Sequence, residues 1–235
     1  MAGRRKRRVR RSSGKWKTTL LVVTIVAIVA VVIVFNIYGS GFSSNTSGNG
    51  STNNIVVSYN GSTYTFGFPY NTTVTYVWSQ EIVFPNSTRR PYGLEFEGIQ
   101  SYRVLNVTAK KMLGTEELPL WFYVVSSNNN VSRTVYTLYS TIALPLELLG
   151  KPTLAMNPVG KEIIETRIGA RKAWHYVSKL TPRSKECYVF EGDYYFDTET
   201  GVLLKEETKC YPPPDSGYPN GTYVYYVKEI VEFKK

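Results

Sequence analysis

Two kinds of hydrophobic pattern divide the chain. Residues 18–38, TTLLVVTIVAIVAVVIVFNIY, form one apolar run without a charge, whereas short apolar–polar alternations broken by Gly, Pro and Asn begin at residue 55. A helix of about 20 residues spans ~30 Å, the thickness of a bilayer's hydrocarbon core. The run is rich in β-branched residues, but in lipid a helix satisfies its own backbone hydrogen bonds. The pattern therefore predicts a transmembrane helix at 18–38 and a folded domain at 55–235.

Charge around the apolar run sets its expected orientation. Residues 1–17 hold nine basic residues and no acidic one, and no further basic residue occurs before Arg89. The positive-inside rule then predicts a basic cytoplasmic tail at 1–17 and a domain outside the cell membrane. A cleaved signal peptide is the alternative, with Gly39–Gly41 as a weak cleavage candidate. We favour a single-pass signal-anchor, because signal peptides usually have apolar runs of only about 7–15 residues.

The segment between membrane and domain is a linker. Residues 39–54, GSGFSSNTSGNGSTNN, contain too little apolar surface to fold. Eight sequons of the form Asn-x-Ser/Thr occur in this linker and in the domain that follows, whereas chance composition predicts about two to three. The expected glycosylation sites are Asn45, Asn49, Asn60, Asn71, Asn86, Asn106, Asn130 and Asn220. Every one of them lies on the side already predicted to be outside, which favours a glycoprotein.

The alternating pattern of the domain predicts about ten strands and at most one short helix, at 144–152. Asn60-Gly61 suits a type I′ turn between two strands, and further hairpins are expected around residues 128–130, Gly169 and 198–201. Consecutive hairpins favour an antiparallel meander that curves into a half-barrel or barrel-like sheet to bury one face. The expected fold class is therefore mainly β.

The two cysteines flank one of these hairpins. If the turn centres near Glu199, Cys187 and Cys210 lie opposite each other or one residue out of register. Cross-strand Cβ atoms are close enough for a disulfide, and an outside location permits oxidation. We expect a structural disulfide; the alternatives are two buried thiols or a redox pair, which would lack a Cys-x-x-Cys motif.

Net charge changes the expected partners. Nine of the 28 basic residues lie in the tail, so the rest of the chain carries 19 basic against 18 acidic residues. A basic folded face is therefore lacking, and nucleic acid is excluded as a partner. The membrane itself, other cell-envelope proteins or a lipid-like ligand remain as expected partners.

The sequence offers little for catalysis. The single histidine, His175, has no nucleophile elbow to serve, and a structural role is the simpler interpretation. Glu95 and Glu97 would share one strand face at the separation of a glycosidase pair, but acids two apart on a solvated strand are common. No calcium loop or phosphate-binding loop is present. We expect no enzyme, no metal and no cofactor.

The last third of the domain resembles known proteins. YYFDTETGVLLKEE (194–207), preceded by ETRIGARKAWHYVSKL (165–180), resembles a hairpin unit of small membrane-anchored archaeal surface proteins of unknown function. It is similar also to a hairpin in the bacterial lipoprotein-carrier half-barrel family. That family's fold wraps a curved antiparallel sheet around an apolar cavity closed by a helix.

Two functions follow from these observations. The leading hypothesis is a non-enzymatic, membrane-anchored and glycosylated surface protein with a structural or interaction role. The resemblance implies an alternative, a carrier or sensor that holds an apolar ligand or lipid; an extracellular hydrolase is the third. The candidate lining of a carrier pocket is aromatic: Trp78, Trp121, Phe122, Trp174, Tyr194 and Tyr195.

Overall fold

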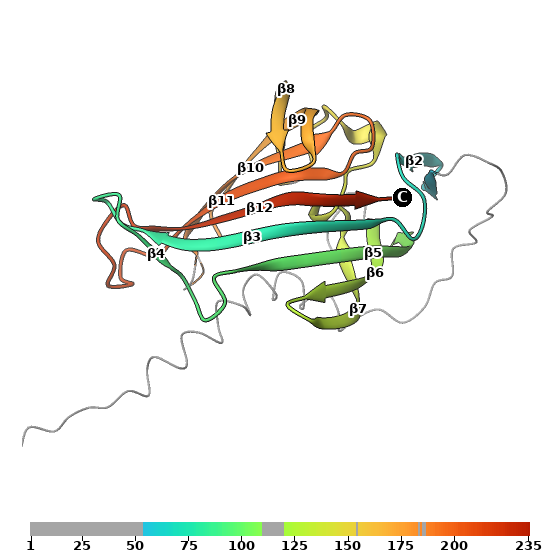
Figure 1. The fold of residues 1–235 in the computed structure, drawn as a ribbon. Coiled ribbons are helices and arrows are strands. Elements are labelled where there is room, and N and C mark those ends of the chain that lie inside the picture. The colour runs from blue at the N-terminus through green and yellow to red at the C-terminus, as the bar shows by residue number, and fades with distance from the viewer. Residues whose placement is uncertain (1–53, 110–119, 154, 183, 185–186) are drawn as a thin grey trace, which may run out of the picture.

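The computed structural model describes residues 54–109, 120–153, 155–182, 184 and 187–235 (Figure 1). The basic tail, the expected transmembrane helix at 18–38, nearly all of the linker and the sequons at Asn45 and Asn49 lie outside these residues. Within the described ranges, no helix combines the length and the apolarity needed to span a bilayer.

The domain is mainly β, as the alternation predicts, and among the described residues its helices are two short 3-10 turns. The first half contains β1 (Ile55–Tyr59), β2 (Ser62–Phe66), β3 (Thr73–Val83), β4 (Arg89–Pro91), β5 (Glu97–Ala109), β6 (Leu120–Asn128) and β7 (Val131–Leu138). The second half contains η1 (Tyr139–Thr141), η2 (Leu146–Leu148), β8 (Asn157–Thr166), β9 (Gly169–Leu180), β10 (Val189–Asp197), β11 (Leu203–Tyr211) and β12 (Tyr223–Lys234).

The strand order is not the simple meander that the hairpins predict. All pairings are antiparallel, and the large sheet runs β7-β6-β5-β3-β12-β11-β10-β9-β8, with β4 beside β3. The last strand thus lies between β3 and β11 and joins two smaller meanders into one sheet that stays open at β7 and β8 (Figure 1). Because β3 and β12 are far apart in sequence, no local signal could reveal their pairing.

One face of this sheet carries the core. The β1–β2 hairpin and the segment around η1 and η2 pack against it, as shown by the rings of Phe66 and Phe122, whose centroids lie 5.0 Å apart. Farther along, the hydroxyl of Tyr76 donates to the carbonyl oxygen of Ile142 at 3.3 Å. A single short 3-10 turn, η2, stands where a helix was expected at 144–152.

The opposite face is crossed by the turn between β8 and β9. Lys228 faces the core, so its neighbour Glu229 faces the other way, because successive side chains alternate along a strand. The backbone N–H of Arg167, in that turn, donates to Glu229 Oε1 at 3.0 Å. The turn therefore reaches over β10 and β11 to contact β12 on the outer face of the sheet.

The predicted turns form with the expected backbone. Asn60 and Gly61 have φ values of 47° and 77°, which are the two left-handed positions of a type I′ turn. Asn129 and Asn130 do the same between β6 and β7, with φ values of 43° and 74°. Asn and Gly tolerate this conformation, so these residues fix the registers of both hairpins.

Candidate functional site

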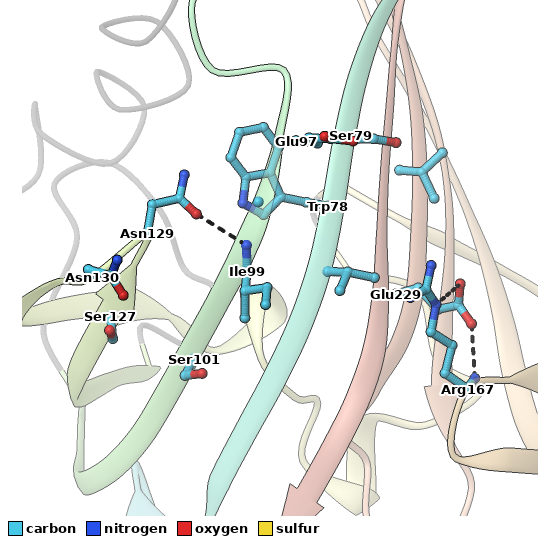
Figure 2. A pocket seen from close by; sticks show the side chains of 13 residues that line it. Trp78, Ser79, Glu97, Ile99, Ser101, Ser127, Asn129, Asn130, Arg167 and Glu229 are labelled. Carbon is cyan, nitrogen blue, oxygen red and sulfur yellow. Dashed lines mark hydrogen bonds and ion pairs between the residues drawn. The ribbon is translucent and has the colours of Figure 1, made fainter.

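A cleft of about 880 Å³ lies on the outer face, where β3, β5 and β12 run side by side (Figure 2). Sheet register builds its floor from two rows. One row is Glu97–Ser79–Val227, and the next is Ile99–Val77–Glu229. Ile99 and Val77 of one row and Val227 of the other form an apolar strip that runs obliquely across the floor, and Glu97 and Glu229 end the two rows on opposite sides.

Two turns form the walls of this cleft. Asn129 and Asn130 come from the β6–β7 turn, and Arg167 comes from the β8–β9 turn (Figure 2). Asn129 Oδ1 accepts from the backbone N–H of Ile99 at 3.3 Å. A side chain at Gly98 would collide with this amide, because Asn129 Oδ1 lies 2.5 Å from the position of its Cβ. Glycine at position 98 thus lets the β6–β7 turn approach β5 closely.

Charges at the cleft are partly neutralised. Besides the backbone contact, Arg167 Nε lies 3.8 Å from Glu229 Oε2, so both oxygens of this carboxylate face Arg167. Ser101 Oγ lies 3.0 Å from Thr75 Oγ1. The cleft thus offers hydroxyl, amide and carboxylate groups around an apolar strip.

The aromatic residues named as a carrier pocket do not gather at this cleft. Trp78 borders it from β3, but Trp78 pairs with Lys228 and so shares the core face, where its ring stacks on Tyr226 with centroids 6.3 Å apart. Phe122 lies in the core against Phe66, and Trp121, its neighbour in β6, points to the other side of the strand.

Of the remaining three candidates, Trp174 and Tyr194 share the core face, because Trp174 pairs with the buried Phe196 and Tyr194 with the buried Tyr176. Trp174 lies on β9, with Lys161 Nζ 4.9 Å from its ring centroid. Tyr194 and Tyr195 are consecutive in β10 and therefore face opposite sides of the sheet. Tyr195 stacks on His175, with ring centroids 4.6 Å apart. Burial, with a smaller contribution from Asp193, raises the pKa of Tyr195 to about 12, so its hydroxyl keeps its proton at neutral pH.

His175, on β9, links three strands. Its Nε2 lies 2.8 Å from Asp193 Oδ1 on β10, and its Nδ1 lies 3.1 Å from Glu162 Oε1 on β8. Both ring nitrogens are therefore occupied by carboxylates. In the part of the chain that the structure describes, no group of three or more His, Cys, Asp or Glu is arranged for a metal ion.

The two acids weighed as a hydrolytic pair have separate surroundings. Glu97 borders the cleft at the start of β5. Glu95 precedes that strand, and its Oε2 accepts from Asn129 Nδ2 at 3.4 Å. Glu95 thus supports the cleft wall, and the structure gives it no role beside Glu97 at a reacting centre.

A buried ion pair is the feature that sequence reasoning missed. Lys228, only 2% exposed, places its Nζ 3.9 Å from Glu206 Oε2 on the neighbouring strand and 2.8 Å from the carbonyl oxygen of Thr141. The same ammonium lies 4.4 Å from the ring centroid of Tyr76. Burial lowers the pKa of Lys228 and raises the pKa of Glu206, and attraction between the two charges opposes both shifts.

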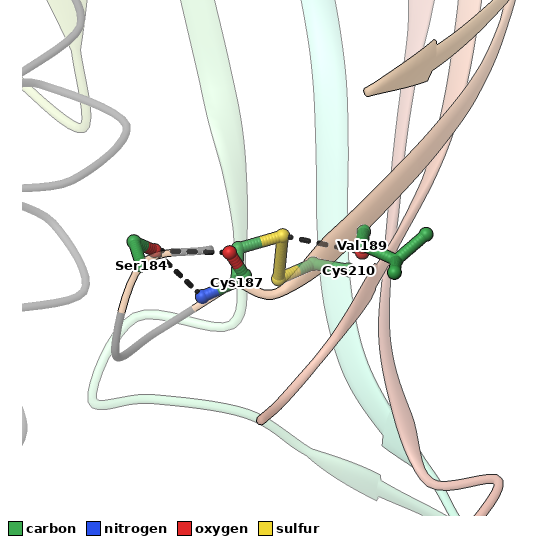
Figure 3. Close-up of a disulfide and its surroundings, with 4 residues drawn as sticks. All are labelled: Ser184, Cys187, Val189 and Cys210. Carbon is green, nitrogen blue, oxygen red and sulfur yellow. Dashed lines mark hydrogen bonds between the residues drawn. A yellow bond between two sulfur atoms is a disulfide. The ribbon is translucent and has the colours of Figure 1, made fainter. Parts of the chain in front are cut away.

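The disulfide between Cys187 and Cys210 forms, but not in the expected register (Figure 3). The residue paired with Cys210 is Phe190, three positions after Cys187. Cys187 lies outside β10 in a turn where its N–H donates to Ser184 Oγ at 2.9 Å, and the two Cα atoms are 5.4 Å apart. The chain before β10 therefore folds back onto β11, and the bond anchors a loop to a strand instead of joining two paired strands.

The described sequons all lie on the surface of the domain. All described sequon asparagines are exposed: Asn60, Asn71, Asn86, Asn106, Asn130 and Asn220. Asn106 lies within β5, whereas the other five lie in turns or loops between strands. Surface turns are where an acceptor asparagine can be reached by a glycosylating enzyme.

Comparison with known proteins gives a partial structural likeness only. No protein-family model matches the sequence, and no curated protein matches it. The structure is similar to a "putative lipoprotein" from Parabacteroides distasonis, at 14% identity and a TM-score of 0.35, covering 72% of this chain and 98% of that one. It is also similar to a "putative exported protein with YmcC-like fold" from Bacteroides fragilis, at 10% identity and a TM-score of 0.37, covering 73% and 99%. At such scores the likeness carries no argument, and function has to be argued from the residues.

Proposed function

We propose that this chain is a non-enzymatic, membrane-anchored and glycosylated surface protein whose folded domain has an interaction role. The observation that carries the proposal is the exposure of every described sequon asparagine. A folded domain with acceptor sites over its surface suits an outside location. The uncharged run at 18–38, preceded by nine basic residues, supplies the anchor and the orientation.

The outer cleft supports an interaction role. Pockets for drug-like ligands are mostly apolar, whereas this one combines serine hydroxyls, the Asn129 amide and two carboxylates with a strip formed by Val77, Ile99 and Val227. A saccharide has the matching chemistry, because its hydroxyls take hydrogen bonds at the sides and its C–H face covers an apolar strip. We therefore assign a polyhydroxylated ligand to the cleft.

Two other functions have less support. A carrier would need its aromatic residues around one cavity, and Trp78 is the single member of the expected six that borders the cleft. A hydrolase would need two free carboxylates at the cleft, but Glu229 is held by Arg167 and leaves Glu97 without a partner acid there.

A substitution in the cleft floor tests the interaction role. Ile99→Glu places a carboxylate under the bound saccharide, where it would be desolvated without a partner, so affinity should fall at least about tenfold. The measurement is binding of the full-length protein, purified from its membranes, to a panel of immobilised oligosaccharides. Val56→Glu is the matched control, since Val56 is 51% exposed on β1, close to the 55% of Ile99, and lies outside the cleft.

The expected result is binding that survives in Val56→Glu and is lost in Ile99→Glu. Unchanged binding in Ile99→Glu would remove the cleft from the interaction, and failure of every saccharide to bind the unaltered protein would contradict the assigned ligand class.

A further inference from the structure

The open edge of β8 has an exposed apolar row. β8 is the last strand in the sheet order, so among the described strands it pairs only with β9. Ile163 is 74% exposed and Val159 is 61% exposed, two of the highest values among the large apolar side chains described. Such an edge is a template for another strand unless charges or covering segments block it.

Glycosylation sites avoid this side of the domain. None of the eight sequons lies between residues 131 and 219, a stretch that contains β7 to β11 and therefore all of β8 and its neighbour β9. The other edge differs, because β7 begins directly after the sequon asparagine Asn130. A glycan there would hinder strand addition at β7, whereas nothing comparable stands at β8.

The charges on β8 are self-complementary. Lys161, Ile163 and Glu165 alternate along the strand and are exposed. When β8 is laid antiparallel against an identical strand with Ile163 opposite Ile163, Lys161 of each copy stands opposite Glu165 of the other. Directly opposed apolar side chains and opposite charges stabilise a strand pair. Charges on an edge strand normally prevent pairing with other strands. A second β8 is an exception, because it presents a glutamate opposite each lysine.

We propose that two copies of this chain associate through β8, antiparallel and in register about a two-fold axis at Ile163. The contact is isologous, so it closes after two copies and does not propagate into fibres. Residues 160–166 of each strand overlap, and a Cβ added at Gly160 would have nothing within 4 Å, so this position leaves room for Thr166 of the second copy. The interface is the free edge of β8, whereas the floor of the outer cleft belongs to β3, β5 and β12.

Cysteine crosslinking of the full-length protein in its membrane tests the register. In the dimer the two Ile163 positions are directly opposed, within the ~4.4–6.8 Å Cα separation that a disulfide accepts. Ile163→Cys should therefore crosslink to a dimer under mild oxidation. Val159→Cys is the matched control, because its own counterpart would lie eight residues away, about 26 Å along the strand. The native cysteines are paired with each other and do not compete.

Charge reversal tests the pairing itself. In the Ile163→Cys background, Lys161→Glu opposes two glutamates and Glu165→Lys opposes two lysines, so each should lower the crosslinked fraction roughly fivefold or more. The double variant restores opposite charges and should restore crosslinking. Lys161→Glu also removes the contact of Lys161 with Trp174, but the double variant shares that loss, so recovery isolates the contact between copies.

Equal crosslinking of Val159→Cys and Ile163→Cys would overturn the register. The β8 dimer would be overturned if neither cysteine variant crosslinked. It would also be overturned if the double charge reversal crosslinked no better than either single reversal.

Discussion

Replacing Lys228 by alanine is expected to lower the free energy of unfolding by about 3–5 kcal/mol, the usual cost of removing one member of a buried ion pair. The ammonium is almost fully buried, contacts Glu206 at 3.9 Å and donates to Thr141 O at 2.8 Å. Its loss leaves a carboxylate and a carbonyl without their partner inside an aromatic surrounding. Urea unfolding followed by tryptophan fluorescence measures the change.

Removing both charges of this pair should cost much less stability than removing one of them alone. Burial shifts the pKa of both groups toward their neutral forms despite their mutual attraction. A double variant, Lys228→Met with Glu206→Leu, removes both desolvated charges and should recover most of the stability lost in Lys228→Met. If the double variant were as unstable as the sum of the two single variants, the two residues would not be coupled and the interpretation would be wrong.

Stability should also depend on pH through this pair. The pKa of Glu206 is raised from 4.5, so the folded state holds its proton longer and stability falls as pH rises from 4.5 through the raised value. The pKa of Lys228 is lowered from 10.5, so stability rises as pH increases from the lowered value to 10.5. The double variant should lose both slopes.

Replacing Gly201 by alanine is expected to have the second large effect, lowering the free energy of unfolding by about 3 kcal/mol or more. Gly201 has a φ of 74°, which costs an alanine about 1–2 kcal/mol. Its Cβ would also collide with the carbonyl oxygen of Leu144, and crowding of this kind adds about 1–3 kcal/mol. The collision would separate two segments joined by the hydrogen bond from Leu144 N to Gly201 O, at 2.8 Å.

Gly217→Ala provides the control for this change. Gly217 has a φ of 81°, and nothing lies within 4 Å of its added Cβ, so only the conformational cost applies. Thermal unfolding should therefore shift much less for Gly217→Ala than for Gly201→Ala. Equal shifts in the unfolding temperature would show that the collision with Leu144 does not contribute to the destabilisation of Gly201→Ala.

Much of the fold could be predicted because it is encoded locally. The Asn60-Gly61 turn, the hairpin closed by Gly169 and the final strand all follow from alternation and turn residues. The pairing of β3 with β12 could not be predicted, because Gln80 and Tyr226 meet across most of the domain's sequence. The disulfide was predicted correctly, whereas its register was not, because the chain folds back at Ser184 before β10 begins.

The site was harder to predict than the fold. Aromatic type alone suggested one pocket, yet alternation already requires Tyr194 and Tyr195 to face opposite sides. The cleft depends on where the β8–β9 turn contacts Glu229, a contact across two intervening strands that has no sequence signature. Lys228 looked like an ordinary member of an alternating strand, and only the packing of Thr141 and Tyr76 against it shows its burial.

The central claim is that this domain stands outside the membrane as a glycosylated surface protein. Glycopeptide mass spectrometry of the protein isolated from its own membranes tests it most directly, because occupied acceptor sites record exposure to the glycosylation machinery. The account predicts glycans at the exposed turn sequons, including Asn86 and Asn220. Unmodified asparagine at all the described sequons would contradict the outside location and, with it, the proposed role at the cell surface.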